Sequence, residues 1–232
     1  TDNGGSYSSD YDGEDFGLNY YSGSSGFDES DVKIDLVEVI DSSSSMSQTQ
    51  FNMEINGIRN AIDNVLRPLV ERGAEIYVGF VNFSTSANII KDVGPGDPAS
   101  NLIKLEEKKT NDTVDERLDS INQLGGMTDV EEALQKAETV LSSGSSARQN
   151  IVDFSSDGIP TIDTNPSSPP DPVTSATQKA TFMKNAGTEI WPIGLTISPN
   201  STGGLFMKTI AGPDPAEASF ADSFSDYNQV VE

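Results

Sequence analysis

The chain has 232 residues, no cysteine and no histidine, and a formal net charge of −23 at pH 7. This length suits one α/β domain with a buried core, or such a domain with an appendage. The acidic balance argues against nucleic acid, because a phosphate backbone would be repelled, and the missing residue types exclude disulfides, thiolate or imidazole zinc sites, and Ser-His or Cys-His nucleophiles.

The sequence also predicts where the chain works. No apolar run approaches membrane-spanning length, so we expect no transmembrane segment. The first residue is Thr1 rather than Met, from which we expect a removed signal peptide and an extracellular or cell-surface location. The excess of acid suits surroundings rich in divalent cations.

Residues 1–31 contain no Lys or Arg and are rich in Asp, Gly and Ser, a composition typical of disordered segments. Within them, Phe16, Leu18 and Tyr20 alternate with polar or small residues, as in a short strand. We therefore expect an acidic N-terminal extension over 1–31 and a folded domain over 32–232. The extension is predicted to dock on its own domain or on a neighbouring copy, which would give self-association.

The apolar run 32–40 predicts a central strand that is buried on both faces, and a serine-rich loop follows it. Asp41, Ser43 and Ser45 stand at alternate positions, so a folded-back loop can direct three oxygens toward one point. One carboxylate and two hydroxyls suit a hard divalent cation. The alternative is a serine-rich turn that caps a helix beginning near Gln48.

Further along the chain, apolar residues at helical spacing predict a helix over 51–70 that ends at Gly73. The remaining pattern alternates between the two types of element. We predict strands over 76–83, 87–90, 151–156 and 190–196, helices over 114–124, 130–141, 176–185 and 205–210, and a last strand from Phe220. This alternation predicts a doubly wound sheet with helices on both faces, in which ligands lie beyond the carboxyl ends of the strands.

Two later loops complete a pattern with the serine loop. Gly125-Gly126-Met127-Thr128-Asp129 is a flexible turn followed by a hydroxyl and a helix start, and Asp157-Gly158 ends the strand over 151–156. The order strand-DxSxS, GGxT, strand-SDG resembles the von Willebrand factor A family with its metal-ion-dependent adhesion site. The resemblance covers roughly residue 32 to the C-terminus.

The resemblance implies a mostly parallel six-stranded sheet in the order 3-2-1-4-5-6, with one antiparallel edge strand. It also implies that Ser43, Ser45 and Thr128 ligate a cation through their hydroxyls, while Asp41 and Asp157 act directly or through waters. Mg²⁺ is the expected ion, with Ca²⁺ or Mn²⁺ as alternatives. A partner protein would complete the coordination shell with an acidic side chain.

We expect recognition rather than catalysis, because no base or nucleophile stands beside these residues; hydrolysis by metal-bound water is the enzymatic alternative. The predicted function is an exported adhesion or protein-binding module. A structural subunit of a surface filament or matrix, in which the metal mainly stabilises the loops, is the second possibility. The proline-rich loop 159–173 follows Asp157 directly, and we expect it to select partners through Ile159, Pro160, Pro169 and Pro170.

Two acids interrupt the predicted strands, Glu38 before Asp41 and Asp153 before Asp157. In adjacent parallel strands they would lie at similar depth, with Asn82 near them. Buried carboxylates cost several kcal/mol unless they are paired or protonated. We favour the alternative in which helix packing leaves these faces open to water.

Overall fold

In this computed structural model the described residues are 28–91, 100–108, 112–165, 171–212 and 218–221. The predicted strand around Phe16, Leu18 and Tyr20, and the residues Pro169 and Pro170, lie outside them. A short 3₁₀ turn, η1 (Glu29–Asp31), precedes the first strand.

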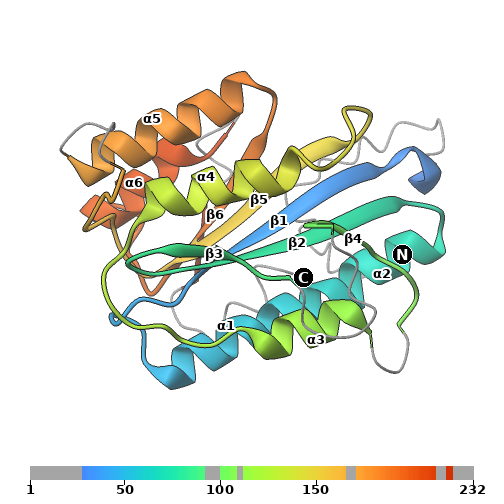
Figure 1. Ribbon diagram of the computed structural model, residues 1–232, viewed down its shortest axis with the longest axis horizontal. Helices are drawn as coiled ribbons and strands as arrows, with labels where there is room; N and C mark the ends of the chain where they lie inside the picture. Colours follow the sequence, from blue (N-terminus) through green and yellow to red (C-terminus); the bar gives the residue numbers. More distant parts are fainter. Residues whose placement is uncertain (1–27, 92–99, 109–111, 166–170, 213–217, 222–232) are drawn as a thin grey trace, which may run out of the picture.

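A single seven-stranded sheet runs through the molecule in the order β3-β2-β1-β5-β6-β7 (Figure 1). Neighbouring strands in this order are parallel except for β3, which returns antiparallel along β2, so the predicted strand order and fold class are confirmed. The bounds are β1 (Lys33–Asp41), β2 (Glu75–Phe83), β3 (Ala87–Ile89), β5 (Gln149–Ser156), β6 (Glu189–Leu195) and β7 (Ser219–Ala221).

The seventh strand, β4 (Ile103–Lys104), was not predicted from the sequence. It pairs antiparallel with Tyr77 and Val78, whereas β3 pairs with the later part of β2 from Val81 to Phe83. Since β1 occupies the other edge of β2 along its whole length, β3 and β4 share its outer edge. Two residues give too little alternation to be recognised as a strand.

Helices cover both faces of the sheet (Figure 1). The helices α4 (Val130–Leu141), α5 (Pro172–Asn185) and α6 (Thr202–Ile210) lie on one face and share a core with Val37 and Val39 of β1. The helices α1 (Gln48–Ala61), α2 (Arg67–Glu71) and α3 (Thr113–Ser120) lie on the other face, toward Ile40. The alternation of β1 therefore supplies both cores, as a central strand requires.

The helix predicted over 51–70 is interrupted by a π-helical turn, η2 (Ile62–Leu66), between α1 and α2. The Arg67 amide bonds back to the Ile62 carbonyl, five residues earlier. Pro68 follows directly and has no amide hydrogen, so an ordinary helical bond at that position is impossible. The wider turn accommodates the proline without breaking the helix.

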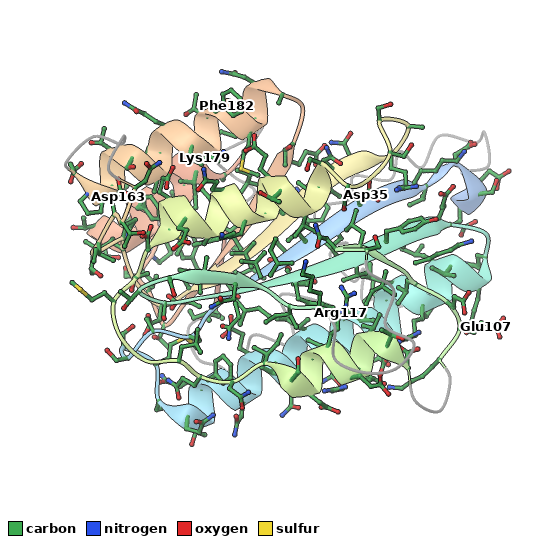
Figure 2. The ribbon with its side chains drawn as sticks, viewed as in Figure 1. Asp35, Glu107, Arg117, Asp163, Lys179 and Phe182 are labelled. Atoms are coloured by element: carbon green, nitrogen blue, oxygen red, sulfur yellow. The ribbon has the colours of Figure 1, made fainter. Side chains whose placement is uncertain are left out.

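Near the start of β1, the buried carboxylate of Asp35 connects three strands (Figure 2). Its Oδ1 accepts a bond from Arg148 Nε at 2.5 Å, and the guanidinium lies 3.9 Å above the Tyr77 ring and 3.2 Å from Glu75 Oε1. β1, β2 and the start of β5 are thereby held in register. The opposite ends of the same strands carry the predicted site.

Candidate metal centre

The serine loop is fixed to the end of β1 by short bonds. The Ser42 amide and hydroxyl both donate to the Phe83 carbonyl at 2.8 Å, which anchors the loop to β2. The Ser43 amide donates to Asp41 Oδ1 at 2.8 Å, an Asx turn that folds the chain back over the strand end. The helix α1 then starts with Ser47 and Gln50 in a capping box, so the serine-rich stretch both forms the loop and caps a helix.

Four of the five predicted ligands lie together at this strand end. The hydroxyls of Ser43 and Ser45 are 2.8 Å apart, and Ser45 Oγ donates to Asp157 Oδ1 at 2.7 Å. Asp41 joins them through Ser156, whose hydroxyl donates to Asp41 Oδ2 at 2.6 Å. Residues more than 100 positions apart in the sequence therefore share one small group of oxygens.

Thr128, the fifth predicted ligand, belongs to a loop that is tied to the serine loop. The Gly125 amide donates to the Ser42 carbonyl at 2.8 Å, and the Ser44 amide donates to the Gly126 carbonyl at 3.0 Å. Both glycines have positive φ, which permits this close approach. Thr128 is buried, and among the described residues its hydroxyl makes no hydrogen bond to the other four ligands.

Of the two carboxylates of the group, Asp41 is buried and Asp157 is partly exposed. Burial raises the pKa of Asp41 to about 6, although bonds from Ser156 and Ser43 oppose this rise. Burial also raises the pKa of Asp157, opposed by the Ser45 hydroxyl. Two desolvated carboxylates and three hydroxyls form an all-oxygen donor set, which fits a hard divalent cation.

Sequence reasoning missed Ser156 and Gln123. Ser156 is the serine of the SDG pattern, but its bond to Asp41 depends on the pairing of β1 with β5. Gln123 Nε2 donates to the Met46 carbonyl at 2.5 Å and so braces the serine loop from the loop that carries Thr128. Gln123 lies outside the three-loop pattern, and the contacts of both side chains are revealed only by the structure.

A second layer of acids lies beneath the site, on the face toward α1. Glu38 stands opposite Asp153 in the register, and Glu54 of α1 accepts a bond from the Ser155 hydroxyl. Glu38 and Glu54 are buried, so the expectation that this face stays open to water is wrong for Glu38. The reason is that α1 packs directly over this part of the sheet.

These buried acids are incompletely paired. Asp153 Oδ1, Glu54 Oε2 and Asn82 Oδ1 are buried and accept no hydrogen bond. Burial, followed by the charge of Asp153, raises the pKa of Glu38 well above its usual range, and burial raises the pKa of Asp153 to about 7. Both shifts favour the protonated form of this pair over two buried charges.

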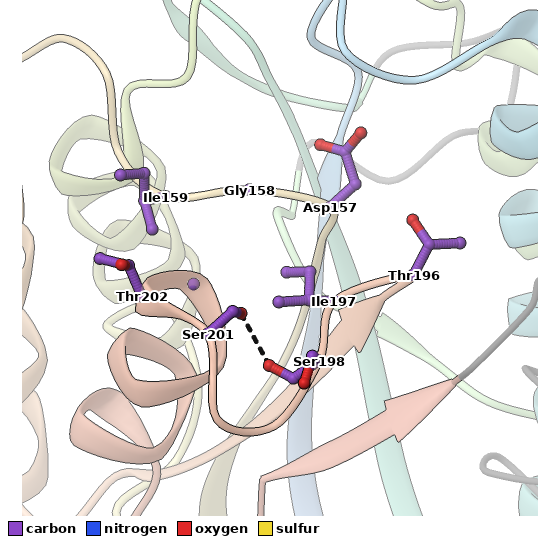
Figure 3. A pocket seen from close by; sticks show the side chains of 9 residues that line it. Asp157, Gly158, Ile159, Thr196, Ile197, Ser198, Ser201 and Thr202 are labelled. Carbon is purple, nitrogen blue, oxygen red and sulfur yellow. Dashed lines mark hydrogen bonds between the residues drawn. The ribbon is translucent and has the colours of Figure 1, made fainter.

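A pocket of about 400 Å³ opens beside Asp157 (Figure 3). Ile159 lines it together with Ser198 and Ser201 of the β6–α6 connection and Thr202, the first residue of α6. Ser201 Oγ donates to the Ser198 carbonyl at 2.7 Å and caps α6 through the Gly204 amide. Of the residues predicted to select partners, Ile159 reaches this pocket and Pro160 is buried.

A family model described as the von Willebrand factor type A domain matches residues 35–232 of the chain. No curated protein matches the chain by sequence. The family resemblance found from the three loops is thereby confirmed. Within the described residues, no helix has both the length and the apolar character needed to cross a membrane.

Solved structures share the fold at low identity. The vWF domain of Mfa5, a type V pili tip protein from Porphyromonas gingivalis, matches at TM-score 0.65 and 16% identity, covering 86% of this chain and 93% of that one. The pilus adhesin SpaC from Lactobacillus rhamnosus GG gives 0.62 and 16%, with 86% and 30% covered. Proximal thread matrix protein 1 from the mussel byssus, with a zinc-occupied MIDAS motif, gives 0.63 and 19%, with 86% and 46% covered. The chain thus spans less than half of the length of the SpaC and byssus chains.

Replacing Asp153 by Asn should make stability less sensitive to pH. The pKa of Asp153 is raised from 3.8 to about 7, so the folded state keeps a proton that the unfolded state releases. Its contribution to stability is fully present below the lower value and is lost as the pH rises through the upper one. Asp153→Asn cannot ionise, so we expect a free energy of unfolding at pH 8 higher than wild type by at least about 1 kcal/mol.

The measurement is urea unfolding in EDTA at several values between about pH 5 and pH 8. Asp31→Asn, which changes an exposed aspartate ahead of β1, is the matched control and should follow the wild-type curve. An Asp153→Asn curve parallel to wild type would show that Asp153 carries no proton at neutral pH.

Proposed function

Because the chain belongs to the von Willebrand factor type A family, we propose that it is an exported, metal-dependent adhesion or protein-binding module. In this proposal Asp41, Ser43, Ser45, Thr128 and Asp157 hold one divalent cation, with Mg²⁺ as the first choice and Ca²⁺ or Mn²⁺ as alternatives. The cation supplies a Lewis-acidic point that can bind a carboxylate of a partner protein. The observation that carries the proposal is the continuous contact from Ser43 through Ser45 to Asp157.

The residues themselves favour binding over catalysis. Three hydroxyls and two carboxylates supply five oxygens, which leaves one position of an octahedral shell for a carboxylate from a partner. Hydrolysis would also require a general base beside the attacking water. The two nearest carboxylates, Asp41 and Asp157, already accept bonds from Ser156 and Ser45, which hold them as orienting groups.

The pocket beside Asp157 supports a role in partner selection. It adjoins the proposed cation site on one side and the start of α6 on the other (Figure 3). A partner whose carboxylate reaches the cation can place a neighbouring side chain against Ile159 and the hydroxyls of Ser198 and Thr202. We therefore propose that the loop following Asp157, which includes Ile159, Pro160, Pro169 and Pro170, together with this pocket, sets specificity.

Replacing Asp41 by Ala should abolish the stabilisation of the protein by Mg²⁺. A ligand that binds only the folded state adds RT ln(1 + [L]/Kd), about 2.7 kcal/mol at 100 times Kd. Thermal unfolding in EDTA and in excess Mg²⁺ measures this difference, and Asp31→Ala, an exposed aspartate, should respond as wild type does. Binding of peptides from a display library with a fixed central aspartate should require Mg²⁺ and be lost in Asp41→Ala. A wild-type protein without any Mg²⁺ response would refute the cation site.

Replacing Thr202 by Trp should block the pocket and leave the cation site intact. Thr202 is exposed at the first position of α6, so a larger side chain there projects over the pocket without entering the core. We expect at least about tenfold weaker binding of the library-selected peptides, because the tryptophan excludes a peptide side chain from the pocket. The Mg²⁺-dependent shift in melting temperature should be unchanged. Thr209→Trp, at the exposed far end of the same helix, is the control. Equal peptide binding by both variants would remove the pocket from the recognition surface.

A structural subunit of a surface assembly is a second candidate, favoured by the likeness to a byssus thread matrix protein. In this case the extension before η1 would dock on a neighbouring copy. Deleting residues 1–27 leaves Glu29 and its ion pair with Arg72 in place, so the folded domain keeps its own contacts. Lower oligomer mass by light scattering would support assembly through the extension, and a lower melting temperature at constant mass would indicate a clamp within one chain. If neither changes, the extension has neither role.

A further inference from the structure

A second group of carboxylates lies outside the proposed cation site. Asp129 caps α4, Glu131 stands in its first turn, and Asp163 comes from the loop that follows β5. One oxygen from each of the three lies within 4.8 Å of the others. Figure 2 shows Asp163 at the end of the molecule where α4 and α5 begin.

Glu131 contributes a buried carboxylate oxygen that lacks a hydrogen-bond partner. Its side chain is only 7% exposed, and Oε1 accepts a bond from Asn165 Nδ2 at 3.2 Å. Oε2 is buried and has no hydrogen-bond partner. A buried carboxylate oxygen without a partner is destabilising, so something must compensate it.

The other two carboxylates are held in fixed orientations by the protein. Asp129 accepts bonds from the Glu132 amide at 3.0 Å and from the Thr164 amide and hydroxyl at 2.9 and 2.7 Å. Asp163 accepts from the Asn165 amide at 2.8 Å and the Ser175 hydroxyl at 2.5 Å. These donors fix the position of the oxygens and leave further lone pairs free.

In the described part of the chain, the three carboxylates lack a paired cation. Among the described residues, no Lys or Arg forms an ion pair with Asp129, Glu131 or Asp163. Lys179 is the cation that acts on Glu131 electrostatically, but its ammonium group is paired with Glu138 at 2.5 Å. The N-terminus of α4 contributes only about half a positive charge against three carboxylates.

We propose that Asp129, Glu131 and Asp163 form a second cation site, which takes a calcium-class ion through the free Glu131 Oε2. Ca²⁺ accepts oxygen ligands at about 2.3–2.6 Å in flexible geometry, so ligands on opposite sides of one ion stand about 4.6–5.2 Å apart. The three oxygens lie within 4.8 Å of one another, so their separations are compatible with one shared ion. The absence of histidine and cysteine leaves only oxygen donors, which disfavours softer metals.

Such an ion would brace the loops around Thr128. Thr128 and Thr161 are joined twice, by the Thr128 amide on Thr161 Oγ1 and by the Thr161 amide on the Thr128 carbonyl, both at 2.9 Å. The second site begins one residue after Thr128 and includes Asp163, two residues after Thr161. The cation therefore fastens α4 to the loop that follows Asp157.

The competing explanation is a proton on Glu131. Burial, followed by the charges of Asp163 and Asp129, raises the pKa of Glu131, while the Asn165 bond lowers it. A protonated Oε2 could donate to a neighbouring carboxylate and would need no metal. Calcium binding separates the two explanations.

The experiment titrates CaCl₂ into Asp41→Ala by calorimetry, because that change removes the first proposed site. We expect one calcium ion per chain for Asp41→Ala, and affinity weakened by more than about tenfold for Asp41→Ala with Glu131→Gln, since even outer-shell changes cost that much. Asp41→Ala with Glu71→Gln, which removes an exposed glutamate of α2, should bind as Asp41→Ala does. Asp163→Asn repeats the test should the Glu131→Gln protein be poorly folded.

The outcomes are distinct from those that test the proposed function. Absence of calcium binding by Asp41→Ala would overturn the second site and leave the proton on Glu131 as the explanation. Undiminished binding by both Glu131→Gln and Asp163→Asn would also overturn it. A wild-type protein that ignores Mg²⁺ while Asp41→Ala binds calcium would refute only the first site.

Discussion

The parallel pairing of β1 with β5 is the constraint on which the site depends. Ile40 stands opposite Ser155, so Asp41 and Ser156 leave the sheet side by side and the Ser156 hydroxyl bonds to Asp41 Oδ2 at 2.6 Å. Residues 115 positions apart cannot be joined by local preference, and only the sheet topology brings them together. A shift of one residue in this register would turn Asp41 to the opposite face. The buried Asp35–Arg148 pair at the other end of the same strands opposes such a shift.

Several acidic side chains are buried near the carboxyl end of the sheet. For Glu38, Glu54 and Asp41, burial is the largest cause of a raised pKa. The free-energy cost of burying a carboxylate can be reduced by a proton, a hydrogen-bond donor or a cation. The depth of the carboxylate below the surface determines which of these can reach it. Glu38 is enclosed between the sheet and α1, which favours a proton. Asp41 lies beneath hydroxyls that reach the surface through Ser45, and this arrangement gives a cation access.

The family, the strand order and the position of three loops could be predicted from the sequence. The reason is that the patterns containing Asp41, Thr128 and Asp157 each follow an apolar run or a turn. Features that depend on side-chain direction could not be predicted. Ser156 acquires its role from register, and the burial of Glu38 comes from α1 packing over it. Asp129 was read as a helix start, which is correct as a cap. Its proximity to Asp163 depends on the path of a loop that has no periodic pattern.

The segment from Thr128 to Glu131 connects the proposed recognition face to the second acidic group. Thr128 is bonded to Thr161, whereas Asp129 is bonded to Thr164 and caps α4. When a partner binds to a loop, the conformational entropy that the loop loses makes the binding free energy less favourable. A cation held by Asp129, Glu131 and Asp163 would remove that freedom before the partner arrives. The second site could therefore raise affinity at the first without touching the partner, because both use the same short stretch of backbone.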